Sequence, residues 1–344
     1  MSARRARGGR RSGTGTRRRP ITREFVDGKP VYRLVGRKIT SAREIERLNA
    51  LAIPPAWTEV EIARSPSAKV LARGRDAAGR TQTIYHPAYR RRRDREKFDR
   101  VTRFAEALPA LRARVDRDLR RRSLSRDRVV AGVVRLIDRQ FFRVGNVEYA
   151  KSTGSFGATT VRREHVRVTS ETVLFDFIGK SGKRHRRRVR DPRVARLVAR
   201  LMELPGPEVF RFFDEDGVVH RLDSRHVNAY VKRHMGEEFS AKDFRTWGGT
   251  LLAASLLFEA DPAELADAKA AAAARRAAVR EVAERLGNTA AVAQSSYIDP
   301  RVLEAFENPT AVERVRSARI RPRRYLGIEE QRTLRLLREQ RGAR

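Results

Sequence analysis

The sequence predicts an α+β protein, in which a small β-rich domain precedes a larger, mainly helical domain that contains a small β-sheet. Three observations predict this. Short alternating segments lie between residues 58 and 86, helical periodicity dominates after residue 95, and β-branched segments cluster between 156 and 190. With 344 residues, 40% of them hydrophobic, the chain is long enough to build about two packed domains.

The N-terminal region divides into an arm, 1–19, and a β-rich domain, 20–92. The arm carries eight arginines and no acid, so we expect it to be disordered and attracted to polyanions. In the domain, Ser41 and Glu44 form a capping-box pattern that opens a helix to about Leu51, and the segment Pro54–Trp57 ends it.

Three strands are predicted after that helix: Thr58–Ala63, Lys69–Gly74 and Thr81–His86. The turn-rich segment Asp76–Gly79 joins the last two strands. Pro87 and the run Arg90–Arg93 then interrupt the pattern, so we predict a basic linker here and a second domain over 93–344.

The second domain is predicted to be mainly helical. Its expected helices are 95–107, 109–121, 127–142, 192–203, 223–235, 242–258, 262–286 and 300–307, with a last helix around Leu326–Leu337. Its expected strands are Thr159–Val168, Val173–Ile178 and Arg184–Val189, and the segment Gly179–Gly182 is the tightest hairpin turn.

The charge balance points to nucleic acid. Lys and Arg number 77 against 42 acids, a net charge of +35, and self-repulsion of that size destabilises a compact protein unless a polyanion screens it. Phosphate contacts release counterions and supply much of the affinity for DNA. A high genomic GC content would explain Arg in place of Lys, but it does not explain the excess over acids. A membrane surface is the weaker alternative, because no basic amphipathic helix adjoins a long apolar run.

Other chemistries are excluded or not expected. The absence of cysteine excludes disulfides, thiolate metal sites and a thiol nucleophile. The six histidines form no H-x-x-x-H pair, so we expect neither a metal nor another cofactor. No apolar stretch approaches the roughly 20 residues of a membrane span, and no apolar signal core begins the chain, so a cytoplasmic, nucleoid-associated protein is expected.

Five residues carry a recognisable chemistry only when they are taken together. Each alone has an ordinary structural interpretation, such as a salt-bridged arginine, a solvated lysine or a packed tyrosine. In chain order they stand in the patterns R-x-G, hairpin lysine, K-D-x-R, L-G-N and S-Y-x-x-P; they are Arg143, Lys180, Arg245, Asn288 and Tyr297.

That order resembles the poxvirus-like branch of type IB DNA topoisomerases, its bacterial members especially. The flanks extend the resemblance from about Ser41 to Tyr325; they include the segments Pro54–Trp57, Gly74–Arg80, Tyr85–Pro87, Lys97–Asp99 and Glu148–Tyr149. The resemblance implies the catalytic fold shared by type IB topoisomerases and tyrosine recombinases, within a C-shaped clamp. The implied partner is supercoiled duplex DNA, bound by a monomer that needs no nucleotide.

The resemblance also implies a role for each residue. Tyr297 attacks the scissile phosphate to give a 3′-phosphotyrosyl link. Arg143 and Arg245 stabilise the transition state, Lys180 protonates the leaving 5′-oxygen, and Asn288 donates a hydrogen bond where many relatives carry histidine. Lys183, on the same hairpin, is an alternative acid. Asparagine cannot carry a charge, so we expect a pH profile of cleavage without a histidine limb.

These residue types suit the chemistry. A tyrosine hydroxyl with a pKa of about 10 is a weak nucleophile that must be positioned, but its phosphodiester conserves the bond energy for resealing, so ATP is not needed. The guanidinium fork presents paired donors to phosphate oxygens and stays charged. A lysine can act as an acid when positive neighbours lower its pKa.

Further residues are candidates for binding DNA. Gln82 and Tyr85 align with the strand that relatives lay in the major groove, although packing on a half-exposed sheet is an equally good interpretation of Tyr85. Thr83 stands where poxvirus enzymes carry an aromatic residue, so their target preference need not be retained. The remaining candidates for DNA contact are Arg80, Arg91, Arg92, Tyr149, Lys183 and Lys242, and the stretch Arg184–Arg190 is expected to follow the DNA backbone.

Two rival functions remain at this stage. A tyrosine recombinase or integrase shares the catalytic residues, but its second arginine typically follows H-x-x, whereas Lys242 precedes Arg245 by three positions. Recombinases also carry a helical N-terminal DNA-binding domain. A non-enzymatic, basic DNA-binding protein would fit the composition, but it gives no reason for five motifs in order.

Overall fold

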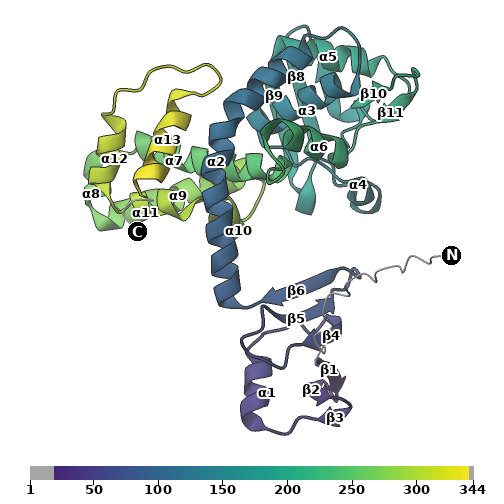
Figure 1. Ribbon diagram of the computed structural model, residues 1–344, viewed down its shortest axis with the longest axis vertical. Coiled ribbons are helices and arrows are strands. Elements are labelled where there is room, and N and C mark those ends of the chain that lie inside the picture. Colours follow the sequence, from purple (N-terminus) through teal and green to yellow (C-terminus); the bar gives the residue numbers. More distant parts are fainter. Residues whose placement is uncertain (1–18, 341–344) are drawn as a thin grey trace, which may run out of the picture. The chain divides into compact units, whose positions relative to one another are not determined.

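The computed structural model describes residues 19–340 (Figure 1). The predicted arm, 1–19, therefore lies almost wholly outside the described residues. The chain divides into two compact units, one ending at Lys97 and the other starting at Phe98. The mixed α+β class is confirmed. No helix in the described part is long and apolar enough to cross a bilayer.

The first unit is built on a six-stranded antiparallel sheet in the order β3-β2-β1-β4-β5-β6. The strands are β1 (Ile21–Val26), β2 (Lys29–Leu34), β3 (Arg37–Lys38), β4 (Thr58–Ile62), β5 (Val70–Arg75) and β6 (Thr81–Tyr85). The predicted helix is α1 (Ala42–Asn49), where Ser41 Oγ accepts a hydrogen bond from the Glu44 amide at 3.4 Å. Ile21, Leu48 and Ile62 meet in its core.

Strands β4, β5 and β6 confirm the three predicted strands, whereas β1 to β3 were not predicted. The signal for the β1–β2 hairpin was present: Asp27-Gly28, both in the left-handed region with φ of 50° and 73°, form the two-residue turn. The hairpin was not predicted because four residues of β1 and β2 are charged, which weakens the alternation of apolar and polar residues that indicates a strand.

The predicted linker is wrong, because residues 87–93 begin the long helix α2 (Pro87–Leu119). Pro87 suits a first helical position, where no N–H donor is needed, and His86 Nδ1 accepts from the Ala88 amide at 3.1 Å. Arginine is a good helix former, and Arg92 pairs with Glu96 one turn later at 2.9 Å.

Pro109 likewise does not separate two helices, although a break was predicted there. It removes one backbone donor inside α2, but the residues around it are buried on both sides. Ala105, Leu108 and Leu111 are all fully buried in the core of the second unit, so packing offsets the lost hydrogen bond.

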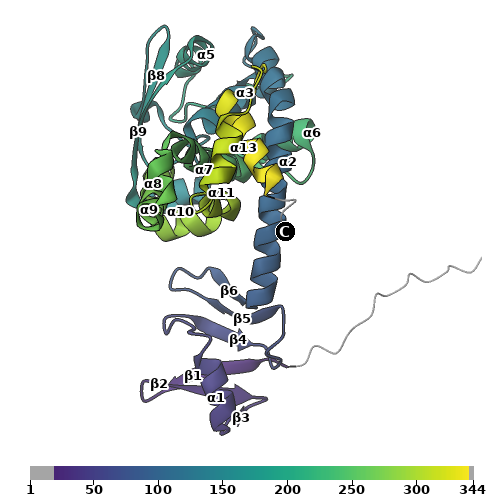
Figure 2. The same ribbon diagram turned by 90° about the vertical axis from the view of Figure 1, so that its left-hand side faces the viewer.

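The second unit is mainly helical (Figure 2). Its helices after α2 are α3 (Arg126–Gln140), α4 (Val147–Thr153), α5 (Pro192–Met202), α6 (Ser224–Met235), α7 (Ala241–Glu259), α8 (Pro262–Ala266), α9 (Ala268–Leu286), α10 (Ala290–Tyr297), α11 (Pro300–Ala305), α12 (Pro309–Arg316) and α13 (Ile328–Glu339). An antiparallel sheet has the order β7 (Val166–Val168), β8 (Thr172–Ile178), β9 (Arg184–Arg190), and β10 (Arg211–Phe213) pairs with β11 (Val219–Arg221).

Two further predictions in this unit are corrected. The predicted strand Thr159–Val168 is extended only at β7, because its first part serves the loop after α3: the Thr159 amide donates to Val144 O at 2.7 Å. The predicted helix 262–286 is two helices, since Asp267 caps α9 by accepting from the Ala270 amide at 2.7 Å. Helices α4, α10 and α12 and strands β10 and β11 were not predicted.

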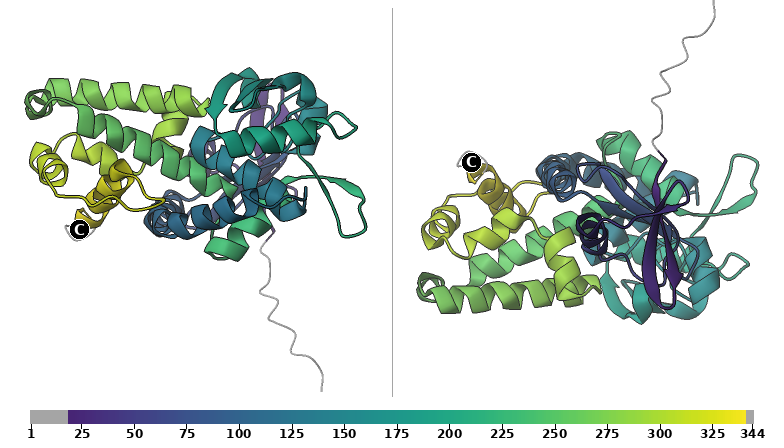
Figure 3. Two further views of the ribbon diagram at one scale, coloured as in Figure 1. Left: turned by 90° about the horizontal axis from the view of Figure 1, so that it is seen from above. Right: turned by 90° about the horizontal axis from the view of Figure 1, so that it is seen from below.

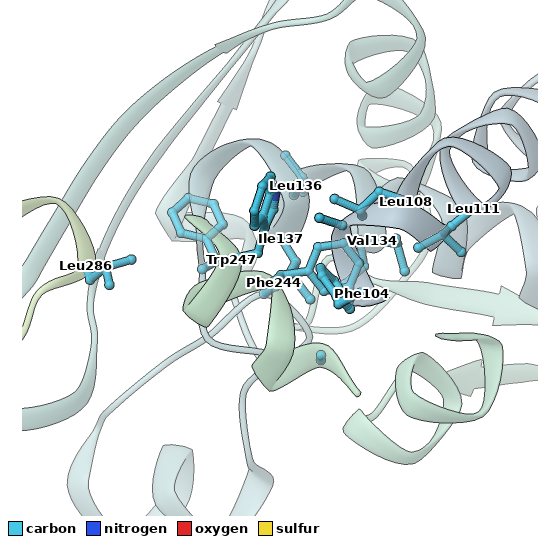
Figure 4. Packing of buried hydrophobic residues seen from close by; sticks show 14 of the residues in the cluster. Phe104, Leu108, Leu111, Val134, Leu136, Ile137, Phe244, Trp247 and Leu286 are labelled. Carbon is cyan, nitrogen blue, oxygen red and sulfur yellow. The ribbon is translucent and has the colours of Figure 1, made fainter. Parts of the chain in front are cut away.

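Helix α7 lies at the centre of the second unit. Its neighbours include α3, α9, α10, α11 and α13, and α7 and α9 can be followed side by side in Figure 3. Figure 4 shows Phe244 and Trp247 of α7 packed among residues of α2 and α3 such as Phe104, Val134 and Ile137. This buried helix carries Arg245, so the core positions a candidate site residue directly.

Candidate active site

The backbone of Tyr297, the last residue of α10, lies against α7. A Cβ placed on Gly249 would lie 2.6 Å from Tyr297 O and 3.2 Å from Tyr297 Cβ, so only glycine permits this approach. Thr250 Oγ1 donates to Tyr297 O at 3.3 Å and accepts from the Asp299 amide at 3.1 Å. Two consecutive α7 residues therefore hold the tyrosine backbone.

The segment that follows the tyrosine is anchored by a buried ion pair. Asp299, fully buried, accepts from Arg301 Nη2 at 2.7 Å, and Arg301 Nη1 donates to Leu337 O at 2.9 Å. Asp299 also caps α11 by accepting from the Arg301 amide. The chain is thus held at Tyr297 itself and at the residues that follow it, which limits how far the tyrosine backbone can move.

Arg245 lies next to the tyrosine ring. Its Cζ is 5.0 Å from the ring centroid of Tyr297, and its side chain is buried, at 3% exposed. Nη1 donates to Phe141 O at 2.5 Å and Nη2 to Leu286 O at 2.8 Å. Asp243, two residues earlier, does not pair with it, because that carboxylate bonds Ser240 and Arg100.

Arg143 and Asn288 form a second pair beside the first. Arg143 Nη2 donates to Asn288 Oδ1 at 2.6 Å, and both terminal nitrogens approach the carbonyls of Leu286 and Gly287 at 3.4 Å. Gly287, with φ +62°, ends α9, and Thr289 caps α10 by accepting from the Val292 amide. The glycine turn between the two helices therefore presents Asn288 to the arginine.

Neither arginine forms an ion pair with a carboxylate in the described residues. Their described acceptors are backbone carbonyls, one amide oxygen and, for Arg245, the Tyr297 phenol. In addition, Arg245 Nε and Asn288 Nδ2 are buried donors with no hydrogen-bond partner. Burying such donors and charges is costly unless an anion completes them, so the arrangement is suited to a phosphate.

The charges shift the pKa values of one another. Burial, reinforced by the nearby Arg143, lowers the pKa of Arg245 to about 10. Burial by itself raises the pKa of the Tyr297 phenol, but the positive charges of Arg245, Arg143 and Lys242 outweigh it, and the pKa falls below its ordinary value. The site therefore makes the phenolate, the nucleophilic form, easier to reach than in an isolated tyrosine.

Lys180 and Lys183 lie together on the turn between β8 and β9. Both side chains are exposed, and within residues 19–340 neither forms a side-chain hydrogen bond or ion pair. Ser181 and Gly182 adopt left-handed φ values of 62° and 71°, and the Gly179 amide donates to Lys183 O at 2.8 Å. The structure thus gathers Tyr297 with Arg245, Arg143 and Asn288, but it brings neither lysine into contact with them.

The other DNA-contact candidates of the second unit are exposed. Tyr149, on α4, is 47% exposed, and Lys242 lies on the surface of α7 one turn before Arg245. Lys242 is close enough to Tyr297 to contribute to lowering its pKa.

In the first unit, two of the candidates bond one acidic turn. Gln82 and Arg80 both donate to Asp76 Oδ2 at 2.8 Å, and the hydrogen bond from Arg80 lowers the pKa of that carboxyl far below its ordinary range. Tyr85 is 45% exposed, with its ring centroid 5.3 Å from that of Tyr89. Arg91 and Arg92 are exposed on the first turns of α2.

The sequence did not single out the groups that support these residues. The glycines at 248 and 249 and the Asp299–Arg301 pair have no chemical signature, although two glycines inside a helical pattern do indicate a close approach. No cluster of three His, Cys, Asp or Glu side chains that could hold a metal ion occurs in the described range.

Comparisons with known proteins agree with this geometry. Residues 86–318 match the family described as eukaryotic DNA topoisomerase I, catalytic core, and residues 32–76 match the bacterial DNA topoisomerase IB, N-terminal domain. The chain is 33% identical over 273 residues to DNA topoisomerase 1B of Acanthamoeba polyphaga mimivirus, covering 78% of this chain and 81% of that protein.

A relative with lower sequence identity aligns over a similar length of the chain. DNA topoisomerase 1B of vaccinia virus, strain Copenhagen, is 22% identical over 271 residues, which cover 76% of this chain and 82% of the viral protein. A fold with a tyrosine near one buried and one partly buried arginine, together with these matches, defines a topoisomerase rather than a recombinase or an architectural protein. The chain belongs to the type IB DNA topoisomerase family.

Proposed function

We propose that this topoisomerase relaxes positively and negatively supercoiled DNA by transient cleavage of one strand at Tyr297. The observation that carries the proposal is the Tyr297 phenol near the buried Arg245 and the partly buried Arg143, neither of which a described carboxylate neutralises. A phosphodiester is the anion that a topoisomerase substrate supplies. The buried Arg245 and the partly buried Arg143 then have a reason to lack an acidic partner.

In the cleavage step, Tyr297 Oη attacks phosphorus and the bond from phosphorus to the 5′-oxygen breaks. The products are a 3′-phosphotyrosyl link and a free 5′-hydroxyl. Arg143 and Arg245 stabilise the charge on the non-bridging oxygens, and the unpartnered Asn288 Nδ2 adds a neutral hydrogen bond. Because the aryl phosphodiester conserves the bond energy, the 5′-hydroxyl can reverse the reaction without ATP.

Lys180 is proposed as the acid that gives its proton to the departing 5′-oxygen and recovers it on resealing. Its position on the exposed hairpin leaves it free to reach a bound DNA strand. Lys183 is the competing candidate, because it lies on the same turn and is equally exposed. No metal is needed for these steps, since the arginines and the lysine supply the positive charge.

The enzyme is proposed to act as a monomer, with the β-rich domain, 20–92, and the catalytic domain, 93–344, closing as a C-shaped clamp around duplex DNA. The contact residues would include Gln82, Tyr85, Arg80, Arg91 and Arg92 from the first domain. From the second domain they would include Tyr149, Lys183 and Lys242.

While Tyr297 holds the 3′ end, the free 5′ end can swivel and release torque. Binding should weaken steeply with salt, as phosphate contacts require.

The test is plasmid relaxation in EDTA without ATP, comparing the wild type with Tyr297→Phe on both positively and negatively supercoiled plasmid. We expect wild-type relaxation of both, and no relaxation or covalent DNA adduct with Tyr297→Phe, which should still bind DNA. Relaxation by Tyr297→Phe would refute the assignment of the nucleophile. A wild type that relaxes only in the presence of Mg²⁺ would refute the metal-independent mechanism.

A further inference from the structure

The imidazole of His185 lies at a point where three parts of the site meet. The residue is on β9, five positions after Lys180, and is buried, at 7% exposed. Its ring centroid lies 5.3 Å from that of Phe177 and 6.2 Å from that of Phe142. Phe142 directly precedes Arg143, so the histidine packs against the backbone segment that carries one of the transition-state arginines.

The same ring separates two glycines that precede the other site residues. A Cβ on Gly179 would lie 2.6 Å from His185 Cδ2 and 2.7 Å from Nε2, and a Cβ on Gly287 would lie 3.1 Å from Cε1. Gly179 is followed by Lys180, and Gly287 is followed by Asn288. One edge of the ring therefore touches the hairpin, and the neighbouring carbon touches the turn between α9 and α10.

The chemistry of the ring suits a spacer rather than a donor of charge. Burial, with Arg187, Arg143 and Arg245 nearby, lowers the pKa of His185 to about 4, so the ring is neutral in the range where enzymes work. No hydrogen bond from the ring to a described residue is present. The neutral, flat ring is close to both glycines through the contiguous atoms Cδ2, Nε2 and Cε1, so packing against it couples their positions.

We propose that His185 is a positioning residue that sets the distance between the Lys180 hairpin and the Asn288 turn. The inference rests on the proposed roles of Lys180 and Asn288. Lys180 itself forms no side-chain hydrogen bond or ion pair with the described residues, so its reach toward the 5′-oxygen depends on where Gly179 is held. The His185 ring fixes the position of Gly179. The same ring packs near Phe142, which directly precedes Arg143.

The first experiment compares two DNA substrates that differ only in the leaving atom. One carries the natural 5′-oxygen, and the other carries a bridging 5′-sulfur, whose thiol has a pKa of about 8.5 and leaves without protonation. We expect His185→Ala to slow single-turnover cleavage of the oxygen substrate by about 10- to 100-fold and that of the sulfur substrate by less than about threefold. DNA affinity should be unchanged.

The effect should also depend on the lysine. In a Lys180→Ala background, His185→Ala should cost little more, because two residues that act through one step are not additive. His220→Ala is the matched control, since this histidine is in the same unit but its side chain is 48% exposed, and it should cleave both substrates like the wild type. Equal losses on both substrates, or fully additive losses with Lys180→Ala, would overturn the positioning role.

A second variant keeps the histidine in the core and moves the hairpin instead. Gly179 has an extended backbone, with φ −98° and ψ −168°, so Gly179→Ala is not strained but meets the ring at 2.6 Å. We expect it to slow cleavage of the oxygen substrate selectively, and the double variant Gly179→Ala, His185→Ala to cleave faster than Gly179→Ala alone. Absence of that recovery would count against contact through the ring.

Failure of the proposed function would look different. If Lys180→Ala itself slows the oxygen and sulfur substrates equally, Lys180 is not the acid, whatever the His185 variants do. If Lys180→Ala is selective for the oxygen substrate and the His185 and Gly179 variants are not, the acid assignment holds and the positioning role of His185 is wrong. Thermal unfolding of each variant separates these outcomes from loss of the fold.

Discussion

The two halves of the site differ in how they are held. Arg245 lies on the buried helix α7, and the backbone of Tyr297, at the end of the more exposed α10, is held against α7 by Gly249 and Thr250. Phe141 O and Leu286 O accept from the arginine. Lys180 lies on an exposed turn whose position is set by backbone contacts and the His185 ring. The half of the site that contains Tyr297 and Arg245 is therefore assembled without DNA. In the half that contains Lys180, the backbone is positioned but the lysine side chain is not.

This difference has a chemical logic. In the proposed mechanism, the nucleophile and the arginines act on one phosphate and need a fixed mutual geometry before it arrives, because preorganised donors lose no energy to reorganisation. An acid on a movable side chain can reach the 5′-oxygen in cleavage and leave it as that strand swivels. We expect substitutions in the buried half to damage chemistry and stability together, and substitutions in the exposed half to damage chemistry alone.

The largest effect is expected from Arg245→Ala. Removing this guanidinium eliminates a principal stabiliser of the transition state, so single-turnover cleavage should fall by about 10³-fold. Arg245→Lys should rescue little, because an ammonium cannot reproduce the fork that bonds two carbonyls. Arg225→Ala, which removes a side chain 89% exposed, is the charge-matched control. A loss under about threefold for Arg245→Ala would show that the buried half is not the chemical centre.

The next effect sharpens the description of the hairpin. Lys180→Ala should slow cleavage of an oxygen substrate by about 10²-fold, whereas Lys183→Ala should slow it by less than about threefold. Both melting temperatures should match the wild type, since neither exposed side chain forms a hydrogen bond or ion pair within the described part of the chain. The reverse ranking of rates would assign the acid to Lys183.

A smaller effect is expected at Asn288, where the two halves adjoin. Asn288→Ala should reduce cleavage by about tenfold, because one neutral donor to the phosphate is lost. Asn288→His should make the cleavage rate depend on pH, with a decrease as the introduced histidine loses its proton. The imidazolium is the better donor, so its contribution is present below the histidine pKa and disappears as pH rises through it.

The wild type should lack that dependence near neutral pH, because His185 stays neutral above about pH 4. Rates of cleavage measured from pH 5 to 9 for the wild type and for Asn288→His provide the comparison. An unchanged profile in Asn288→His would contradict the donor role of position 288.

The smallest effect tests the packing of the buried half. Gly249→Ala would ordinarily stabilise a helix by roughly 1 kcal/mol, but here the methyl group meets Tyr297 O at 2.6 Å. We therefore expect a loss of about 1–3 kcal/mol in the free energy of unfolding and a several-fold slower cleavage. Denaturant unfolding checks the first and single-turnover cleavage the second, with Ser255→Ala on the same helix as control. A stabilised variant would show that the tyrosine backbone is not held by this contact.

Much of the fold could be predicted from the sequence, because helix caps and strand alternation are set by residues close together in the chain. The capping box at Ser41 and the strands β4 to β6 followed from residue types and alternation. The long helix α2 was not predicted, because prolines such as Pro87 and Pro109 ordinarily mark the end or interruption of a helix. Their tolerance depends on a position at the helix start and on burial of Leu108 and Leu111, which residue type does not reveal.

The sequence by itself determined the class of chemistry and the family. Five residue types in a fixed order are a property of the chain, and they predict a tyrosine nucleophile with arginine partners however the chain is folded. The tertiary structure decided which groups meet. Arg143 and Asn288 bond at 2.6 Å although 145 positions separate them, and His185 lies between two glycines from different elements. Such proximity arises from the packing of distant segments around α7, and a burial pattern along one chain does not specify which distant segments will be neighbours.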